Sequence, residues 1–339
     1  MNTTNIGVSV ILCCYNSAKR LPETLKHIAL QNLPDDLPVE VVLVDNASDD
    51  TTSKTAIEEW QKYTSSIKLR IVTELKPGLI NARIKGIEQS KYEIIIFCDD
   101  DNWLLENYIR NAWDIMMRNN NIGALGGEGI PVSNISFPDW FEEYKNSYAC
   151  GKQWHINGIC TSRKYLWGAG LVTRLSIMKK VFSPTHPMLL TGRKEGVLLA
   201  GDDYEICRRI VMLNYDLFYS NNLKYKHFID EKRLDLNYYN KIKKGFAISY
   251  DIIKLYTYVD FRCRHSDFKF ILILVFNTII GLLNRTRLLN IKKTWNLRSY
   301  IQIYRTGINK KGKYHTYYSQ IEWFCKNMKA HHYHPANSM

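Results

Sequence analysis

The first 118 residues alternate short β-branched runs with amphipathic stretches, and this alternation limits the fold more than any other feature of the chain. The strand-like segments are 8–14, 39–44, 68–72 and 93–98, and the helix-like segments are 21–31, 51–63, 79–89 and 104–118. Such alternation is typical of βαβ units, whose parallel strands form one sheet with helices on both faces. We therefore predict an α/β fold with a mainly parallel central sheet flanked by helices.

Polar side chains follow three of these predicted strands directly. Tyr15 and Asn16 come after the first strand, Asp45 and Asn46 after the second, and three consecutive acids, 99–101, after the strand at 93–98. Ligands of open α/β sheets bind outside the carboxyl ends of the strands. These side chains are therefore expected to converge on one crevice.

The acids Asp99, Asp100 and Asp101 end a buried strand, where adjacent carboxylates repel one another and lose hydration. A hard divalent cation such as Mg²⁺ or Mn²⁺ would offset that cost, because such ions bridge carboxylates to substrate phosphates. The alternative is a solvated turn that caps a helix starting near Leu104, with Asp101 or Asn102 as the N-cap.

A second acidic group, Asp202, Asp203 and Glu205, follows Gly201 and opens another helical pattern. Acids in a first helical turn are ordinary, because they cap free N–H groups and complement the helix dipole. Together with the strand-end acids, however, they also fit a metal site combined with a general base. His227 lies near a predicted strand, where a lone histidine is more often a packed residue than a ligand.

Glycine and proline interrupt the alternation at 123–131, and aromatic residues become dense after it. We expect residues 1–122 to bind a nucleotide and residues 123–230 to form an acceptor-facing half on the same sheet. An aromatic side chain in such a segment more often packs in the protein core than stacks on the face of a bound sugar. Trp154 and Trp167 are the two we single out for the acceptor, because both adjoin polar loops that contain glycine.

Residues 231–339 are expected to form a helical, basic region. The apolar stretch 268–283 is slightly short for a membrane span and is interrupted by Asn277, so it predicts either a packing helix or an interfacial one. The formal net charge is +13, with the excess concentrated near the C-terminus. That charge suits phospholipid, a phosphorylated substrate or nucleic acid.

Other patterns narrow the class of protein. The eight cysteines include no C-x-x-C pair, and no signal-peptide pattern precedes the first strand, so we expect a cytoplasmic protein. There is neither a G-x-G-x-x-G nor a P-loop pattern, which disfavours dinucleotide enzymes and P-loop NTPases. The histidine cluster 331–334 is expected to belong to a disordered tail.

Six segments in order resemble the family 2 glycosyltransferases with a GT-A fold: 9–16 (SVILCCYN), 42–51 (VLVDNASDDT), 78–83 (GLINAR), 97–101 (FCDDD), 167–170 (WGAG) and 201–203 (GDD). The resemblance covers roughly residues 6–227 and implies an inverting transferase that uses a nucleotide-sugar donor.

The same resemblance implies roles for individual residues. It implies Tyr15, Asn16 and Asp45 as nucleotide contacts, with Arg83 as a helper near the base or phosphates and Asp99 near the ribose or a metal-bound water. We add Asp100, between the two matched acids, as a further candidate for binding the donor. The resemblance implies Asp101 and His227 as ligands of Mg²⁺ or Mn²⁺, and Asp203 as the general base. For the acceptor site we add Asp202 and Gly170, which lie in the matched segments, to the two tryptophans already named. The chain departs from the family pattern at Cys13, Asn46, Ala47 and Asp202, which stand where proline, an acid, glycine and glutamate are usual.

The sequence therefore predicts a metal-dependent inverting glycosyltransferase that moves a sugar onto a saccharide acceptor, either free or lipid-linked, in the cytoplasm or at the inner face of the membrane. Its setting would be surface polysaccharide or glycoconjugate synthesis, with no nucleic-acid partner. The alternatives are a nucleotidyltransferase, which also uses acidic metal ligands on a parallel sheet, and a non-catalytic basic protein that binds nucleic acid or membrane.

Overall fold

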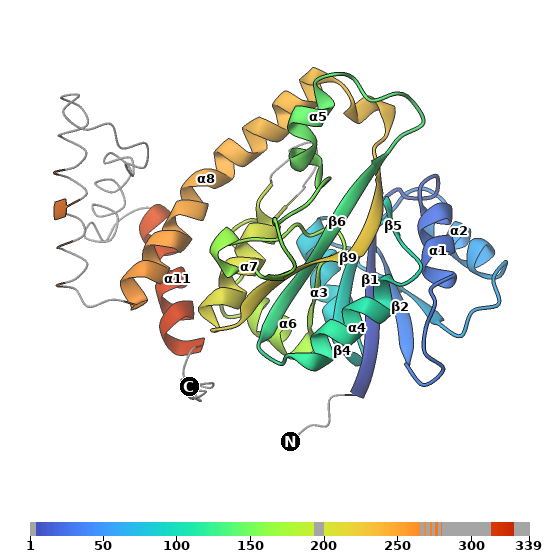
Figure 1. Ribbon diagram of the computed structural model, residues 1–339, viewed down its shortest axis with the longest axis horizontal. Coiled ribbons are helices and arrows are strands. Elements are labelled where there is room, and N and C mark those ends of the chain that lie inside the picture. The colour runs from blue at the N-terminus through green and yellow to red at the C-terminus, as the bar shows by residue number, and fades with distance from the viewer. Residues whose placement is uncertain are drawn as a thin grey trace. The chain divides into compact units, whose positions relative to one another are not determined.

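The computed structural model describes residues 5–192, 200–264 and 313–328, together with Phe268, Leu272, Val275, Phe276 and Ile279. The chain divides into two compact units, Met1–Ser249 and Tyr250–Met339. The first unit contains the sheet and every described residue of the predicted site, and it is shown with the second unit in Figure 1.

The described part of the first unit is built on a nine-stranded sheet in the order β3-β2-β1-β4-β8-β6-β9-β5, with β7 also paired to β9. Strands β3, β2, β1 and β4 are parallel, β8 is antiparallel to both of its neighbours, and β6 and β9 are parallel to each other. The predicted α/β fold is confirmed. The strands are β1 (Asn5–Cys14), β2 (Val39–Asp45), β3 (Lys68–Thr73), β4 (Tyr92–Asp99), β5 (Asn102–Leu104), β6 (Ile122–Val132), β7 (Gly158–Ile159), β8 (Val172–Arg174) and β9 (Asp216–Phe228).

Helices cover both faces of this sheet, because the strands are apolar on both sides. Val10 and Leu12 of β1 belong to a core that includes side chains of α1, α2 and α4, whereas Ile11 points to the opposite face. There α3 approaches so closely that a Cβ on Gly86 would lie 2.3 Å from Cγ2 of Ile11. The helices are α1 (Leu21–Ala29), α2 (Thr52–Trp60), α3 (Leu79–Gln89), α4 (Tyr108–Arg118), α5 (Phe141–Tyr144), α6 (Leu175–Val181) and α7 (Asp202–Met212).

The strand register brings the predicted polar residues to one edge of the sheet. Cys14, the last residue of β1, pairs with Asp45 on β2, and Cys13 pairs with Asp99 on β4. Strand β9 runs parallel to β6 and, through the antiparallel β8, in the same direction as β4. His227 near the end of β9 therefore lies at the same edge as the three acids.

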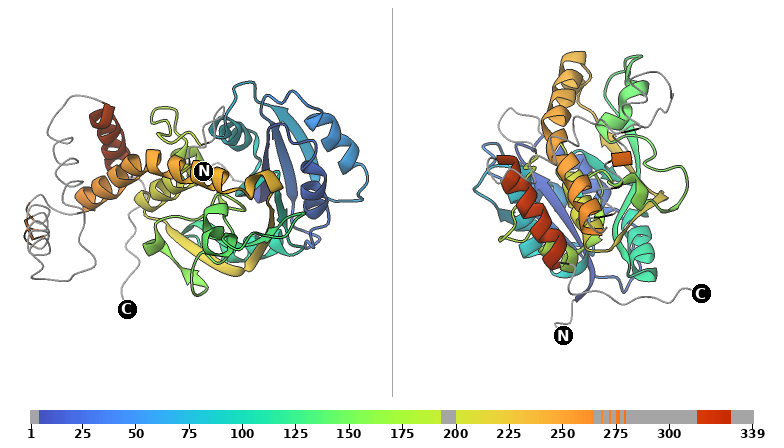
Figure 2. Two further views of the ribbon diagram at one scale, coloured as in Figure 1. Left: turned by 90° about the horizontal axis from the view of Figure 1, so that it is seen from above. Right: turned by 90° about the vertical axis from the view of Figure 1, so that its left-hand side faces the viewer.

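The glycine-rich segment 123–131, where the sequence pattern of alternating strands and helices stops, is part of strand β6. Strands β6 and β9 lie side by side (Figures 1 and 2). A Cβ on Gly127 would lie 2.0 Å from the carbonyl oxygen of Leu223, and one on Gly129 would lie 2.2 Å from that of Ala149. Glycine is therefore required here by close backbone approach, which composition does not distinguish from a turn.

The aromatic residues after β6 mostly form a small core of their own. Phe141 stacks on Phe137 with ring centroids 4.4 Å apart, and Tyr144 stacks on Tyr239 of α8 (Leu236–Arg264) at 4.6 Å. Tyr148 is buried in the same cluster. These side chains pack against one another, which agrees with the ordinary packing role rather than with a sugar platform.

The second unit is described only in part. Tyr258 of α8 lies beside Tyr318 of α11 (Lys313–Met328), whose hydroxyl also accepts a hydrogen bond from Arg262 at 3.2 Å. Of the apolar stretch 268–283, the five described residues are helical and exposed. The rest of that stretch, most of the basic residues after it and the histidine cluster 331–334 lie outside the described residues. No described helix is both long and apolar enough to cross a membrane.

Candidate functional site

The three consecutive acids stand where β4 ends, and the chain continues directly into the short strand β5. Helix α4 starts at Tyr108, with Asn107 at the position before it, so neither Asp101 nor Asn102 is a helix cap. The capping alternative for these acids is therefore wrong. Asn102 instead pairs with His227 in the antiparallel β5–β9 ladder, which places Asp101 beside the end of β9.

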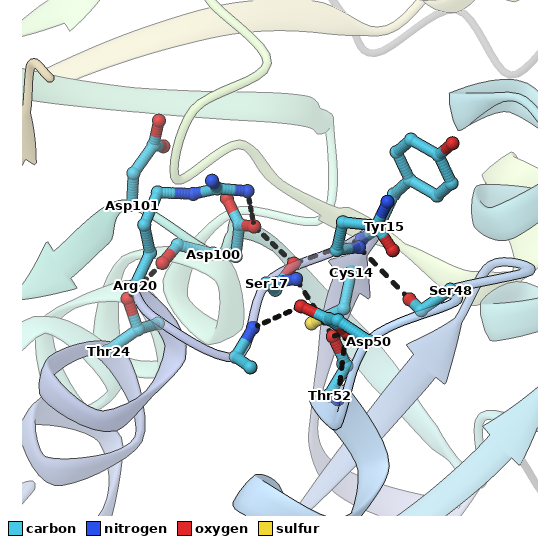
Figure 3. A network of polar contacts seen from close by, with 12 residues as sticks. Cys14, Tyr15, Ser17, Arg20, Thr24, Ser48, Asp50, Thr52, Asp100 and Asp101 are labelled. Carbon is cyan, nitrogen blue, oxygen red and sulfur yellow. Dashed lines mark hydrogen bonds and ion pairs between the residues drawn. The ribbon is translucent and has the colours of Figure 1, made fainter.

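Asp100 ties the strand end to the start of α1, as Figure 3 shows. Its Oδ2 accepts hydrogen bonds from the Ser17 hydroxyl and from Nη2 of Arg20, the latter at 2.5 Å, and its backbone carbonyl accepts one from Thr24 at 2.8 Å. Burial and the charge of Asp101 raise the pKa of Asp100 to about 6, against the opposing effect of Arg20. The described partners of this side chain are thus protein groups that brace the loop.

Asp101 is buried among positively charged and polar donors. Its Oδ2 accepts a hydrogen bond from Nη1 of Arg233 at 2.8 Å, and its Oδ1 accepts one from the Asn102 amide at 3.1 Å. Nε2 of His227 lies 3.4 Å from the same Oδ1. The strand-end acid that the family pattern assigns to a metal is therefore balanced by two cationic side chains.

His227 is held in one orientation by the chain itself. Its Nδ1 lies 2.7 Å from the backbone carbonyl of Tyr148, so this nitrogen carries the proton and donates it. Burial lowers the pKa of His227, but the nearby Asp101 carboxylate more than offsets this and raises the pKa to about 10. A metal would displace the proton from Nε2, as metals do when they bind histidine.

Asp101 and His227 fit a divalent cation as two of its ligands. Two ligand atoms bound side by side to Mg²⁺ at about 2.1 Å lie about 3 Å apart, close to the 3.4 Å between Oδ1 and Nε2. The Tyr148 carbonyl on the other ring nitrogen is the usual partner of a metal-bound histidine. Among the described residues no group of three or more His, Cys, Asp or Glu could hold a metal, so phosphate and water would have to supply the remaining ligands.

The loops after β1 and β2 are joined to each other at the same edge. The Asn16 N–H donates to the Ser48 hydroxyl at 3.1 Å, and the Asn16 side-chain oxygen accepts from the Asp49 N–H at 3.0 Å. Asp45 accepts hydrogen bonds from the Ser53 hydroxyl and the Ser48 N–H. Tyr15 is 57% exposed, and its ring projects away from this network (Figure 3).

Asn46, one of the departures from the family pattern, has a structural role in this chain. Its side-chain amide donates to the backbone carbonyls of Glu74 and Lys76, at 3.1 and 2.8 Å, and its oxygen accepts from the Gly78 N–H at 2.8 Å. The side chain therefore ties the loop after β2 to the loop after β3. An aspartate could not donate the first two of these hydrogen bonds.

Arg83 of α3 connects the two acidic groups. Its buried guanidinium forms an ion pair with Asp202, and the charges of Asp202, Asp99 and Asp203 raise its pKa against the effect of burial. It also lies over the Phe97 ring, 5.3 Å from the centroid. One arginine thus interacts electrostatically with acids from the end of β4 and from the start of α7.

Asp203 occupies the first turn of α7, and its Oδ1 accepts from the Tyr204 N–H at 2.8 Å. Burial and the charge of Asp202 raise the pKa of Asp203 to about 7, whereas hydrogen bonds from Tyr204 and Gly168 and the charge of Arg83 act in the opposite direction. A carboxylate with a pKa near neutrality suits a general base. Glu205 does not, because it is fully buried and accepts hydrogen bonds from the Leu189 and Leu190 N–H groups and from Arg209.

The residues predicted to bind the acceptor differ in burial and in their hydrogen-bond partners. Trp154 is partly exposed and packs against His155, whereas Trp167 is buried and its backbone N–H donates to Gln153. Gly170 has φ +67°, and its carbonyl accepts from the Tyr108 hydroxyl at 2.5 Å. Trp167 is therefore buried and Gly170 is fixed against Tyr108, whereas Trp154 is more accessible to solvent.

Three residues that shape this site were not among those predicted from the sequence. Arg233 and Arg20 pair with the strand-end acids, and Gly168 gives room to Arg83, because a Cβ on it would lie 2.7 Å from Nη2. The position of Gly168 within the 167–170 segment was a signal for its role. No pattern in the sequence links Arg233 to Asp101, since they are 132 residues apart.

Residues 9–168 match the family model described as glycosyl transferase family 2. Human dolichyl-phosphate beta-glucosyltransferase is 38% identical over 100 residues, covering 28% of this chain and 31% of the human protein. Poly(ribitol-phosphate) beta-N-acetylglucosaminyltransferase TarS of Staphylococcus aureus is 28% identical over 136 residues, covering 37% of this chain and 22% of TarS. The chain thus spans a third or less of the length of these relatives.

Two solved structures have a similar fold. The crystal structure of S. aureus TarS 1–349 aligns with a TM-score of 0.50 and 16% identity, covering 75% of this chain and 71% of that one. The crystal structure of GalNAc-T7 with UDP, GalNAc and Mn²⁺ also aligns with a TM-score of 0.50, at 13% identity, covering 76% of this chain and 52% of that one. At these identities the likeness concerns the fold alone.

Proposed function

We propose that this chain, which carries a domain of glycosyl transferase family 2 with a GT-A fold, transfers a sugar from a nucleotide-sugar donor to a saccharide acceptor with inversion. The observation that carries the proposal is the position of Arg83. It forms an ion pair with Asp202 at the start of α7, and the charges of Asp99 at the end of β4 and of Asp203 also stabilise its protonated form. This supports a donor site and a base next to each other at one edge of the sheet.

The nucleotide part of the donor would bind the loops after β1 and β2. Tyr15 offers an exposed ring for stacking, and Asn16 and Asp45 lie in loops already joined by hydrogen bonds. Because these loops are braced before any ligand arrives, binding requires little further ordering. Asp99 and Asp100 at the end of β4 complete this surface, with Asp100 acting through Ser17 and Arg20.

Asp101 and His227 would hold Mg²⁺ or Mn²⁺ together with the donor diphosphate. Such an ion neutralises charge that develops on the departing diphosphate. The donor set agrees with this role, since one carboxylate oxygen and one oriented imidazole nitrogen face each other at 3.4 Å. GalNAc-T7, which shares the fold, was solved with UDP and Mn²⁺.

Asp203 would take the proton of the acceptor hydroxyl as that oxygen attacks the anomeric carbon. The bond from this carbon to the diphosphate breaks as the new glycosidic bond forms, and the proton goes to the carboxylate. A single displacement of this kind inverts the anomeric configuration. The pKa of about 7 allows Asp203 to be ionised before attack near neutral pH and to hold the proton afterwards.

The acceptor is proposed to be a saccharide, lipid-linked where the chain works at a membrane surface. The names of two relatives specify a lipid phosphate, dolichyl phosphate, and a polymer, poly(ribitol phosphate). In this chain Phe268, Leu272 and Phe276 are each helical and exposed, and they recur every four residues in the sequence. With the basic residues that follow in the sequence, these apolar residues suit docking to anionic lipid at the inner face of the membrane.

A donor screen tests the proposed function. The protein is incubated with UDP-, GDP-, dTDP- and CMP-sugars in Mn²⁺ or EDTA, and released nucleotide is measured by chromatography. We expect one donor to be hydrolysed slowly, in Mn²⁺ only, with release of nucleotide rather than pyrophosphate. Pyrophosphate release would instead support a nucleotidyltransferase, and failure of every nucleotide to bind in Mn²⁺ would leave a non-catalytic binding protein.

A further inference from the structure

Arg233 occupies the carboxylate that the proposed metal needs. Its Nη1 donates to Oδ2 of Asp101 at 2.8 Å, and the side chain is only 14% exposed. The Nε of Arg233 is buried and has no hydrogen-bond partner among the described residues. The guanidinium is thus positioned at the site, but one of its donors is unsatisfied there.

The surrounding structure holds Arg233 and His227 as one unit. Tyr148 accepts a hydrogen bond from His227 through its backbone carbonyl, and its hydroxyl donates to the backbone carbonyl of Arg233 at 2.9 Å. The Arg233 guanidinium also lies 5.8 Å from the centroid of the Tyr238 ring. The Tyr148 hydroxyl therefore fixes the backbone of Arg233, and the Tyr238 ring lies beside its guanidinium, so both help to hold the pairing with Asp101.

A guanidinium and a divalent cation compete for the same carboxylate. With Arg233 on Oδ2, a metal approaching Asp101 meets a fixed positive charge, and two like charges in a buried site repel strongly. A diphosphate changes this balance, because its oxygens accept hydrogen bonds from guanidinium and ligate the metal at the same time.

We propose that Arg233 is a built-in counter-cation of Asp101, which gives up the carboxylate to the metal only when a diphosphate arrives to receive its guanidinium. The metal then binds weakly alone and tightly with the nucleotide, so the two enter together. In the exchange Arg233 trades one oxygen partner on Asp101 for phosphate oxygens, which also satisfy its buried Nε–H. This inference rests on the proposed use of a nucleotide-sugar donor.

The test compares two binding constants in the full-length chain and in Arg233→Gln. Mn²⁺ alone is titrated with detection of free Mn²⁺ by electron paramagnetic resonance. The nucleoside diphosphate of whichever donor binds best is titrated by calorimetry in saturating Mn²⁺. We expect Arg233→Gln to bind Mn²⁺ alone about tenfold more tightly and the nucleoside diphosphate about tenfold more weakly, since a hydrogen bond to a charged group is involved in each state.

The opposite signs of these two changes separate the proposal from a merely structural role. A residue that only stabilises the loop would weaken both affinities, and that result would overturn the proposal. Arg233→Lys keeps the charge and should lie between the parent and Arg233→Gln in both titrations. Arg70→Gln removes a more exposed arginine, which pairs with the buried Glu40 near the other end of β2, and should change neither affinity.

The proposed function and this inference fail in different ways. If the parent binds no nucleoside diphosphate even with Mn²⁺, the donor proposal fails and the inference fails with it. If the parent binds the diphosphate and Arg233→Gln leaves the affinity for Mn²⁺ alone unchanged, only the inference is overturned. Thermal melting of each variant shows whether the fold is intact before either titration is interpreted.

Discussion

Replacing Asp203 by asparagine separates its proposed role as a base from a role in starting helix α7. In the parent, Oδ1 of Asp203 accepts a hydrogen bond from the Tyr204 N–H at 2.8 Å. Asparagine keeps an oxygen that accepts the same bond, so the start of the helix is retained. The amide cannot take a proton from the acceptor hydroxyl, and the loss of a positioned base costs about 10²–10⁴-fold in rate.

The pKa of Asp203 adds a second quantity to this prediction. With a pKa of about 7, roughly a tenth of the carboxyl groups are ionised at pH 6 and about nine tenths at pH 8. Because only the ionised form acts as a base, turnover of the parent should fall about tenfold as the pH is lowered from 8 to 6. Asp203→Asn should lose this dependence along with its rate. The groups that face Asp203 and set its titration are Asp202, Arg83, Tyr165, Cys207 and the N–H groups of Gly168 and Tyr204.

The same shift predicts how stability depends on pH. A carboxyl whose pKa is raised on folding holds its proton in the folded chain between about pH 4 and pH 7 while the unfolded chain has lost it. This contribution to the free energy of unfolding is present below the unfolded pKa and declines as the pH rises toward 7. At pH 8 Asp203→Asn should therefore be at least as stable as the parent, because no buried charge remains beside Asp202.

The assay measures sugar transfer to the acceptor, or donor hydrolysis where the acceptor is not yet identified, at pH 6, 7 and 8. Donor affinity and the melting temperature are measured in parallel, and Asp114→Asn on α4 serves as a control for the same substitution away from the site. Near-parental turnover of Asp203→Asn would refute the reasoning. Glu205 would not inherit the role, because its carboxylate is buried and bonded to the 189–190 backbone.

Four further predictions concern the metal, two loops and the membrane. Asp101→Ala should abolish the difference that Mn²⁺ makes to nucleotide affinity, and calorimetry that finds this difference retained would contradict Asp101 as a ligand. Gly168→Ala pushes a Cβ to 2.7 Å from Arg83 and should lower kcat about 10- to 100-fold with the fold intact, which turnover and circular dichroism check together. Asn46→Asp restores the acid usual in the family but sets a carboxylate against two carbonyl oxygens, so urea unfolding should show a loss of about 1–3 kcal/mol; an unchanged midpoint would be inconsistent with the hydrogen bonds described. Replacing the exposed Leu272 and Phe276 together by glutamate should release the chain from vesicles that contain phosphatidylserine, as sedimentation measures, and binding that persists would place the lipid contact elsewhere.

The order of the first strands and helices could be predicted from the sequence because it depends on local patterns. Runs such as Val39–Asp45 are rich in β-branched residues and buried, and the helices between them are amphipathic. The sequence pattern of each segment therefore predicts its secondary structure without reference to the rest of the chain. The polar residues that follow these strands could be predicted to converge for the same reason. Parallel strands present their carboxyl ends at one edge, whatever the details of their packing.

Tertiary structure alone decided how those polar residues are used. The sequence treats Asn46 as a departure from a motif, but its three hydrogen bonds to the loop at 74–78 show a brace. The glycines of β6 resemble a break in the sequence, and only the neighbouring backbone explains them. The pairing of Arg233 with Asp101 is equally invisible along the chain. In each case the partner lies far away in sequence, and electrostatic and steric contacts act through space, so local pattern specifies the elements while their packing specifies the partners of each charge.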